Sequence, residues 1–246
     1  MHTLRAKFKN EIIAEFLPPK HNSDKIVILC DGLPTLPNKK KLLKFFSKKG
    51  FWVFHLRYRG TWESGGEFLQ NSPEQDVLDI IDELPKGFKD GWNGDKYKVN
   101  PKEVCVVGSS FGGATALMCA RSDLVKKVVA FSPLVDWTEP SEEEPLDKFV
   151  EQIKNSFYNA YRSTDKNWQK LLTGKFFNPI NHINEIDGKK VLVFHAKDDK
   201  IINFNPVQNF CKKIGATFIL KKKGGHFSLS KLMRFGFWWK VRKFLK

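Results

Sequence analysis

The chain has 246 residues, 41% of them hydrophobic, which is enough to bury a large core in one domain spanning residues 1–246. Its 42 Lys and Arg residues against 27 Asp and Glu residues give a formal net charge of +15, which attracts anionic surfaces weakly, although no nucleic-acid-binding motif accompanies it. No apolar run approaches the ~20 residues of a bilayer-spanning helix, and the first residues lack the apolar core of a signal peptide, so we expect a cytoplasmic protein.

Strands and helices are predicted to alternate along most of the chain. Residues 11–17 are expected to pair with an earlier segment as an edge hairpin, and later strands are predicted at residues 26–30, 51–56, 104–107, 128–131, 190–194 and 217–220. Helices are predicted at residues 40–49, 72–84 and 114–118. In the second of these helices Ser72 is the expected N-cap, with Pro73 in the first turn and Gln75 completing a capping box. The alternation indicates an α/β fold, with a mostly parallel central sheet covered by helices on both faces.

Residues 137–187 interrupt this alternation after the sixth predicted strand, and we expect them to form a helical cap inserted into the domain. Apolar residues recur at every fourth position of one expected helix and form a single stripe: Phe149, Ile153, Phe157 and Tyr161. Such a stripe is also typical of ordinary helix packing. In both cases we expect the helix to lie over the edge of the sheet at which α/β folds bind ligands.

Residues 108–113 carry the most informative motif of the chain. They contain Gly-x-Ser-x-Gly centred on Ser110, directly after the strand at 104–107 and before the helix at 114–118. The backbone at this serine has to turn so tightly that side chains two residues away would collide, which explains the two flanking glycines. The turn lifts the hydroxyl clear of the sheet, beside free N–H groups of a helix N-terminus that can bind an oxyanion. The pattern predicts a nucleophilic serine rather than a merely glycine-rich turn.

A nucleophilic serine needs a general base, and the base needs an acid that orients it. Two glycines precede His226 and Phe-Ser follows it, on the loop after the strand at 217–220, so its imidazole is free to approach Ser110. Three acids also follow strands: Asp198 and Asp199 after one strand, and Asp136 after another. Because loops after parallel strands meet at one edge of the sheet, all of these side chains are candidates for the same site.

The elbow at residues 108–113, an acid and His226, in this order, resemble the α/β-hydrolase superfamily. Residues 99–104 and 58–64 resemble its single-domain esterases and its prolyl-oligopeptidase-like serine peptidases. The resemblance extends from Lys25 to the C-terminus. It implies the α/β-hydrolase fold, with a cap in the place of the long insertion after the sixth strand.

The resemblance also implies which acid completes the triad. The superfamily's loop His-Gly-x-x-Asp-x-Val aligns with residues 195–201 and points to Asp199, although Ala196 replaces the usual glycine. The implied catalytic residues are therefore Ser110 as nucleophile, His226 as base and Asp199 as the orienting acid.

Two backbone N–H groups are the expected oxyanion hole, those of Phe111 and Leu33. Leu33 follows Gly32 in a segment where the superfamily usually has His-Gly, and here Asp31 stands where histidine is common. Because the donor is a backbone group, the substitution need not abolish activity. The same four residues, 31–34, are also typical of a simple turn.

Other polar residues have structural interpretations. Arg59 is expected to anchor a pocket-wall loop by bonding carbonyls or an acid such as Glu63, and His195, at a strand end, is expected to be structural. The four cysteines are expected to be reduced and buried: Cys30, Cys105, Cys119 and Cys211. No spacing of histidines, cysteines and acids suggests a metal site, and we expect no cofactor. The basic, amphipathic residues 231–246 favour a helix packed on the sheet over one docked on a membrane.

Together these features predict a serine hydrolase that cleaves small-molecule carboxylic esters through an acyl-enzyme. An aromatic-lined cap favours apolar or aromatic acyl groups. A prolyl-oligopeptidase-like peptidase, a thioesterase and an acyltransferase use the same residues and stay open as alternatives. A non-catalytic binding protein on the same scaffold would require a broken triad, and the chain shows none.

Overall fold

The computed structural model describes residues 2–139, 141 and 145–246. Within them, eight strands form one sheet in the order β1-β2-β4-β3-β7-β8-β9-β10. The strands are β1 Leu4–Phe8, β2 Ile12–Leu17, β3 Lys25–Cys30, β4 Trp52–Leu56, β7 Glu103–Ser109, β8 Lys127–Phe131, β9 Val191–Ala196 and β10 Thr217–Lys221. β2 pairs antiparallel with both β1 and β4. Every other pair of neighbouring strands in this sheet is parallel. A separate small hairpin joins β5 Phe88–Lys89 to β6 Lys96–Tyr97.

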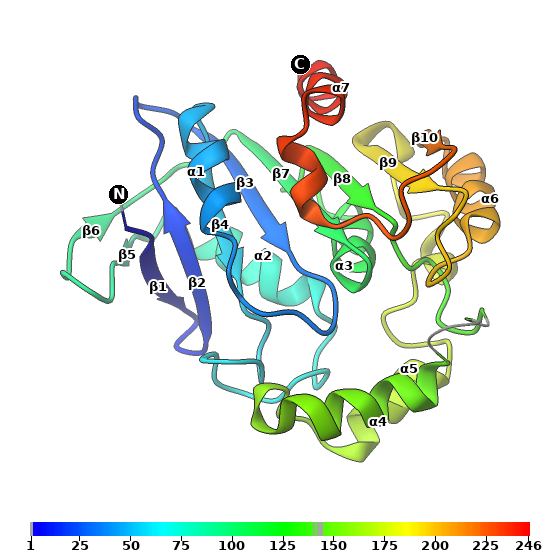
Figure 1. Ribbon diagram of the computed structural model, residues 1–246. Coiled ribbons are helices and arrows are strands. Elements are labelled where there is room, and N and C mark those ends of the chain that lie inside the picture. Colours follow the sequence, from blue (N-terminus) through cyan, green and yellow to red (C-terminus); the bar gives the residue numbers. More distant parts are fainter. Residues whose placement is uncertain (1, 140, 142–144) are drawn as a thin grey trace.

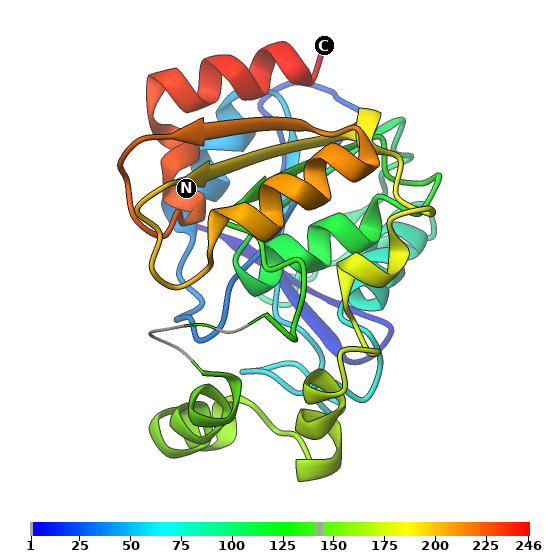
Figure 2. The same cartoon turned by 90° about the vertical axis from the view of Figure 1, so that its right-hand side faces the viewer.

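Helices cover both faces of the sheet (Figures 1 and 2). On one face lie α1 Lys40–Lys48, the short helix η4 Leu229–Met233 and α7 Phe235–Phe244; on the other lie α2 Glu74–Glu83, α3 Phe111–Cys119 and α6 Phe204–Ile214. Successive strand residues pack alternately into the two apolar cores on the two faces of the sheet. In β3, for example, Ile28 belongs to one core and Leu29 to the other. Full burial of such a side chain contributes roughly 1.5–3 kcal/mol. The predicted α/β-hydrolase-type sheet with helices on both faces is confirmed.

The segment between β8 and β9 contains two further helices, α4 Leu146–Phe157 and α5 Asp165–Leu172, and the short helices η1 Tyr158–Ala160, η2 Pro179–His182 and η3 Gly188–Lys190. β8 is the sixth strand of the large sheet in chain order. In both views α4 and α5 form a layer below the sheet, apart from the helices that cover its faces (Figures 1 and 2).

Two local predictions were wrong. The stripe does not continue to Tyr161, because α4 ends at Phe157 and Tyr158 adopts a φ of 37°. Ser72 does not cap α2, because its hydroxyl donates to the carboxylate of Glu74 and no side chain caps that helix. At Ser72 a nearby carboxylate thus competes with the helix N-terminus for the hydroxyl group.

Two other local expectations, on the cysteines and the C-terminal segment, agree with the structure. All four cysteines are buried free thiols. The C-terminal segment packs on the sheet, since Val241 of α7 is fully buried in the same core as Leu232 of η4. Among the described residues, no helix has both the length and the apolar character needed to cross a bilayer.

Candidate active site

Ser110 stands at a sharp turn between β7 and α3. Its backbone has φ 55° and ψ −122°, a conformation that costs a non-glycine residue of order 1–3 kcal/mol. The turn is possible because its neighbours lack side chains: a Cβ on Gly108 would lie 1.8 Å from the carbonyl oxygen of Gly112, and one on Gly112 would lie 2.1 Å from that of Cys30. The strand–turn–helix geometry is that of a nucleophile elbow, with Ser110 half-buried at its tip.

Asp199 and His226 are hydrogen-bonded to each other on the loops after β9 and β10. The Nδ1 atom of His226 lies 3.0 and 3.1 Å from the two carboxylate oxygens of Asp199, whose side chain is fully buried. The N–H groups of Ile201 and Ile202 also donate to this carboxylate, each at 3.1 Å. Burial alone would raise the pKa of Asp199, but the hydrogen bond and charge of His226 and these further donors hold it below its usual value.

The two other acidic candidates bind elsewhere. Asp198 is exposed and accepts hydrogen bonds from the N–H groups of Gly224 and Gly225, at 3.1 and 2.9 Å, just before His226. These bonds lower the pKa of Asp198. Asp136 accepts hydrogen bonds from Thr138 and from the side chain of Asn178. Of the three acids, Asp199 is therefore the one in contact with the imidazole.

Ser132 connects the same loops and was missed by the sequence analysis. It is fully buried, with a φ of 41°, and its hydroxyl oxygen accepts the N–H of Phe227 at 3.0 Å. Its side chain also hydrogen-bonds Asp199 and contributes to the lowered pKa of that carboxyl. A signal was present in the sequence, because Ser132 follows β8 directly, just as Ser110 follows the adjacent strand β7.

Ser110 and His226 line one cavity of about 480 Å³, together with the segment from Asp31 to Thr35. That segment packs closely against Ser110, since a Cβ on Gly32 would lie 3.1 Å from the Cβ of Ser110. Among the described residues, no hydrogen bond joins the Ser110 hydroxyl to His226. Such contacts are often long in unliganded sites and shorten when substrate binds.

The two predicted oxyanion donors flank Ser110. The N–H of Phe111 is the first of α3, and Leu33 follows Gly32 at the end of β3. Neither N–H has a backbone acceptor among the described residues.

Asp31, where the superfamily often has histidine, is buried and paired. Its carboxylate lies 2.7 Å from Nε2 of His55 and 2.9 Å from Nζ of Lys39. Burial would raise its pKa, but the charges of these two partners lower it. Asp31 therefore joins the end of β3 to β4 and to the start of α1, which supports the backbone that carries Leu33.

A second, smaller cavity of about 60 Å³ also adjoins the elbow and shares Leu33, Ser110 and Ile201 with the first. Apolar side chains dominate its walls, and its lining consists of Leu33, Ser110, Phe111, Leu134, Trp137, Glu139, Ser141, Phe149, Ile201 and Ile202. Phe149 comes from α4, so the inserted segment supplies part of the wall around the nucleophile.

Arg59 anchors its loop, but not through Glu63. Its guanidinium lies 2.6 Å from Glu11 and 2.7 Å from Asp79, and it also pairs with Asp76. Glu63 instead pairs with Arg57 at 3.0 Å. The expectation of a structural anchor is confirmed and that of its partner is wrong.

His195 is fully buried within β9, and its Nδ1 atom lies 3.0 Å from the backbone nitrogen and 3.1 Å from the carbonyl oxygen of Ala196. Its Nε2 atom lies 3.8 Å from Asp199 and has no hydrogen-bond partner among the described residues. Burial lowers the pKa of His195 and keeps the imidazole neutral. In the part of the chain that the structure describes, no group of histidines, cysteines and acids has the arrangement of a metal site.

This sheet, with a serine elbow after β7, an acid after β9 and a histidine after β10, defines an α/β hydrolase. The chain belongs to the prolyl oligopeptidase family, whose sequence model matches residues 38–233. A search of curated proteins gave no match.

Solved structures have the same fold. The esterase Pf2001 of Pyrococcus furiosus is 18% identical and superposes with a TM-score of 0.68, covering 99% of this chain and 90% of that one. The α/β hydrolase GrgF from Penicillium sp. sh18 is 14% identical, with a TM-score of 0.71, covering 100% of this chain and 97% of that one. The acylaminoacyl peptidase of Pyrococcus horikoshii is 16% identical, with a TM-score of 0.62. The match covers 95% of this chain but only 38% of that one.

Proposed function

We propose that this protein is a serine hydrolase that cleaves carboxylic esters, with Ser110, His226 and Asp199 as its triad. The observation that carries the proposal is the hydrogen bond between the buried Asp199 and His226, beside the cavity that Ser110, with its strained backbone, also lines. Membership of a hydrolase family supports it independently.

The proposed reaction proceeds through an acyl-enzyme. The Ser110 hydroxyl attacks the ester carbonyl carbon while Nε2 of His226 accepts its proton, and Asp199 holds Nδ1 and stabilises the imidazolium. The N–H groups of Leu33 and Phe111 bind the oxyanion of the tetrahedral intermediate. His226 returns the proton to the departing alcohol. Water then attacks the acyl group with His226 as base, which releases the acid and restores Ser110.

Residues 137–187 are proposed to act as a cap whose α4 narrows the acyl side of the site. The small cavity beside Ser110 has the indole of Trp137 and the ring of Phe149 in its walls, and apolar walls select hydrocarbon over charged groups. We assign this cavity to the acyl group and the larger, more polar cavity to the alcohol.

An ester is favoured over a peptide by the charges around the site. A peptidase that holds a peptide's free amine with an acidic pair would need two unpaired carboxylates near Ser110. The described linings of the two cavities include Asp31, which is already paired with His55 and Lys39, and one glutamate, Glu139. A small-molecule substrate and a cytoplasmic location stay predictions.

Labelling with a fluorophosphonate probe tests the nucleophile. The wild-type protein and the Ser109→Ala variant, which changes the adjacent serine, should react with the probe, whereas Ser110→Ala should not. We expect Ser110→Ala to lower kcat on a nitrophenyl ester by at least about 10⁴-fold. Equal labelling of Ser110→Ala and wild type would contradict the proposal.

Comparing nitrophenyl esters with aminoacyl-nitroanilides and an acyl-CoA then tests the substrate class. We expect the highest kcat/KM on the esters. A higher kcat/KM on nitroanilides or on the thioester would keep the triad and replace the ester by a peptide or thioester substrate.

A further inference from the structure

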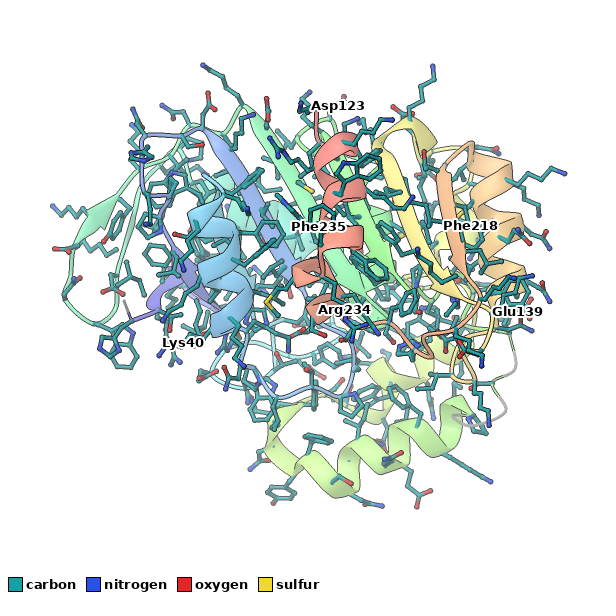
Figure 3. All side chains as sticks on the ribbon, turned by 45° about the horizontal axis from the view of Figure 1, so that its top comes forward. Lys40, Asp123, Glu139, Phe218, Arg234 and Phe235 are labelled. Atoms are coloured by element: carbon teal, nitrogen blue, oxygen red, sulfur yellow. The ribbon has the colours of Figure 1, made fainter. Side chains whose placement is uncertain are left out.

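The C-terminal helix α7 buries one side and leaves the other uncovered. Val241 is buried and Phe237 and Trp238 are partly buried against the sheet core. On the opposite side Phe235 is 82% exposed and Trp239 is 54% exposed, four residues apart and therefore on one face of the helix. Figure 3 looks onto this side of the molecule, with α7 in front of the sheet and Phe235 near its amino end.

This concentration of exposed apolar side chains is unusual within the protein. Eight large hydrophobic side chains are exposed among the described residues, and Met233, Phe235 and Trp239 account for three of them within a span of seven residues. Two cationic groups lie near Trp239, since the Nζ atoms of Lys240 and Lys243 are 6.0 and 5.9 Å from its ring. We refer to the exposed residues Phe235, Trp239, Arg242, Lys243 and Lys246, together with the half-buried Lys240, as the α7 surface.

A cavity of about 600 Å³, here called the basic cleft, adjoins the carboxyl end of α7. Its basic lining residues are His21, Lys25, Lys48, Lys49, Arg242 and Lys246, and its apolar ones are Phe51, Trp238 and Leu245. No Asp or Glu side chain is among the residues that line it, and of its basic residues only Lys25 is paired with a described carboxylate, Glu103 at 3.0 Å. The cleft therefore carries an uncompensated positive charge.

The basic cleft and the catalytic cavity lie at opposite ends of the strands. The cleft is lined by residues just before β3 and β4, whereas Ser110 and His226 follow the carboxyl ends of β7 and β10. Basic residues in the last turns of α1 and α7 also stabilise the helix dipoles. That role does not account for the exposed rings of Phe235 and Trp239.

We propose that the α7 surface and the basic cleft dock on an anionic lipid bilayer. Phe235 and Trp239 enter the interfacial region, where aromatic side chains are stabilised, and the Lys and Arg side chains contact lipid phosphates. The net charge of +15 is complementary to such a surface. Exposed Met233 and Phe235 favour a bilayer over nucleic acid, because a lipid interface offers hydrocarbon for these apolar side chains to enter.

Cosedimentation with vesicles tests this inference. We expect the protein to bind vesicles of phosphatidylcholine containing phosphatidylglycerol, and to bind pure phosphatidylcholine at least about tenfold more weakly. Added NaCl should weaken the binding, because salt screens charges at the membrane surface. Ser110→Ala should bind as tightly as wild type, so the docking result is separate from the test of the hydrolase.

Two pairs of variants locate the surface. The double variant Phe235→Ser, Trp239→Ser should lose at least about tenfold in vesicle affinity, whereas Trp92→Ser, which removes an exposed tryptophan from the β5–β6 hairpin, should not.

Two charge-reversal variants compare basic pairs in the last turns of two helices, α7 and α6. Arg242→Glu with Lys243→Glu, in the last turn of α7, should lose about tenfold or more. The double reversal Lys212→Glu, Lys213→Glu makes the same change in net charge in the last turn of α6 and should bind like wild type. Circular dichroism and fluorophosphonate labelling verify that each variant is folded.

The proposal is overturned if the wild-type protein binds neither type of vesicle, or if both charge-reversed variants lose affinity equally. It is also overturned if a duplex oligonucleotide is bound more tightly than anionic vesicles at the same ionic strength with no contribution from Phe235 and Trp239. That last result would assign the basic residues to nucleic acid.

Discussion

Asp198 and Asp199 are adjacent in the chain and act on the His226 loop in different ways. Asp199 is buried and contacts the imidazole itself. Asp198 is exposed and accepts hydrogen bonds from the N–H groups of the two glycines that precede His226. One aspartate therefore orients the ring, and the other holds the backbone that carries it. Fully buried Ser132 connects Asp199 to the N–H of Phe227, so the acid and the histidine loop share a common support.

Replacing each aspartate by asparagine separates the two roles. Asp199→Asn should lower kcat by about 10⁴-fold, because an amide neither stabilises the imidazolium nor selects the productive tautomer. Asp198→Asn keeps one carbonyl acceptor for the loop and should lower kcat by less than about tenfold. Steady-state kinetics on a nitrophenyl ester provide the measurement, and a larger loss for Asp198→Asn would exchange the two assignments.

The lowered pKa of Asp199 also predicts a pH dependence of stability. A carboxyl group whose pKa is lower in the folded than in the unfolded state stabilises the fold above the unfolded pKa of about 3.9. That contribution disappears as the pH falls through the folded pKa. The difference in free energy of unfolding between wild type and Asp199→Asn should thus shrink as the pH falls below about 4. Urea denaturation over a pH series measures it, and a difference that grows on acidification would be inconsistent with this assignment.

At the scale of elements, the loop after β4 is attached to two other parts of the fold through Arg59. This guanidinium joins Asp76 and Asp79 of α2 to Glu11 in the β1–β2 turn. Asp76 is only 4% exposed, and burial raises its pKa to about 6 despite the hydrogen bonds of Arg59. The contacts of Arg59 therefore compensate the buried charge of Asp76.

Arg59→Ala should lower the free energy of unfolding by about 3–5 kcal/mol at neutral pH, since it leaves Asp76 buried and unpaired. The deficit should be smaller near pH 4, where Asp76 is protonated, and should grow as the pH rises through about 6. Glu11→Gln changes the exposed partner of the same arginine and should cost less than about 1 kcal/mol. Equal losses in the two variants, measured by chemical denaturation, would show that the buried charge is not the cause.

At the scale of the whole molecule, the sheet and the segment between β8 and β9 enclose the proposed acyl site together. The elbow supplies Ser110 and Phe111, and α4 supplies Phe149. The opposite end of the molecule carries the basic cleft, so catalysis and surface attachment are assigned to separate ends of the sheet.

Phe149→Ala should enlarge the small cavity and shift the preference toward longer acyl chains. We expect kcat/KM for a nitrophenyl octanoate, relative to the acetate, to rise by about tenfold. Phe157→Ala truncates a ring on the same helix that contacts Tyr161 and does not line the cavity, so it should leave the profile unchanged. If wild type cleaves only acetate esters, the apolar acyl site is wrong.

The sequence by itself determined the order of strands and helices, the serine elbow and the family. These features depend on neighbouring residues: apolar periodicity, a glycine on each side of Ser110, and a loop histidine after a strand. The limits of such patterns appear at Tyr161, where the expected helix had already ended, and at Ser72, whose hydroxyl found a nearby carboxylate instead of the helix N-terminus.

Only the tertiary structure decided which distant groups meet. It gave Asp199 the contact with His226 and Asp198 the contact with the preceding glycine backbone. It paired Arg59 with α2 instead of Glu63, and Ser132 with the N–H of Phe227. It also left Phe235 and Trp239 exposed. The physical reason is that these contacts join residues far apart in sequence, or depend on which face of a helix the sheet covers. Both are set by the packing of the whole chain rather than by local preference.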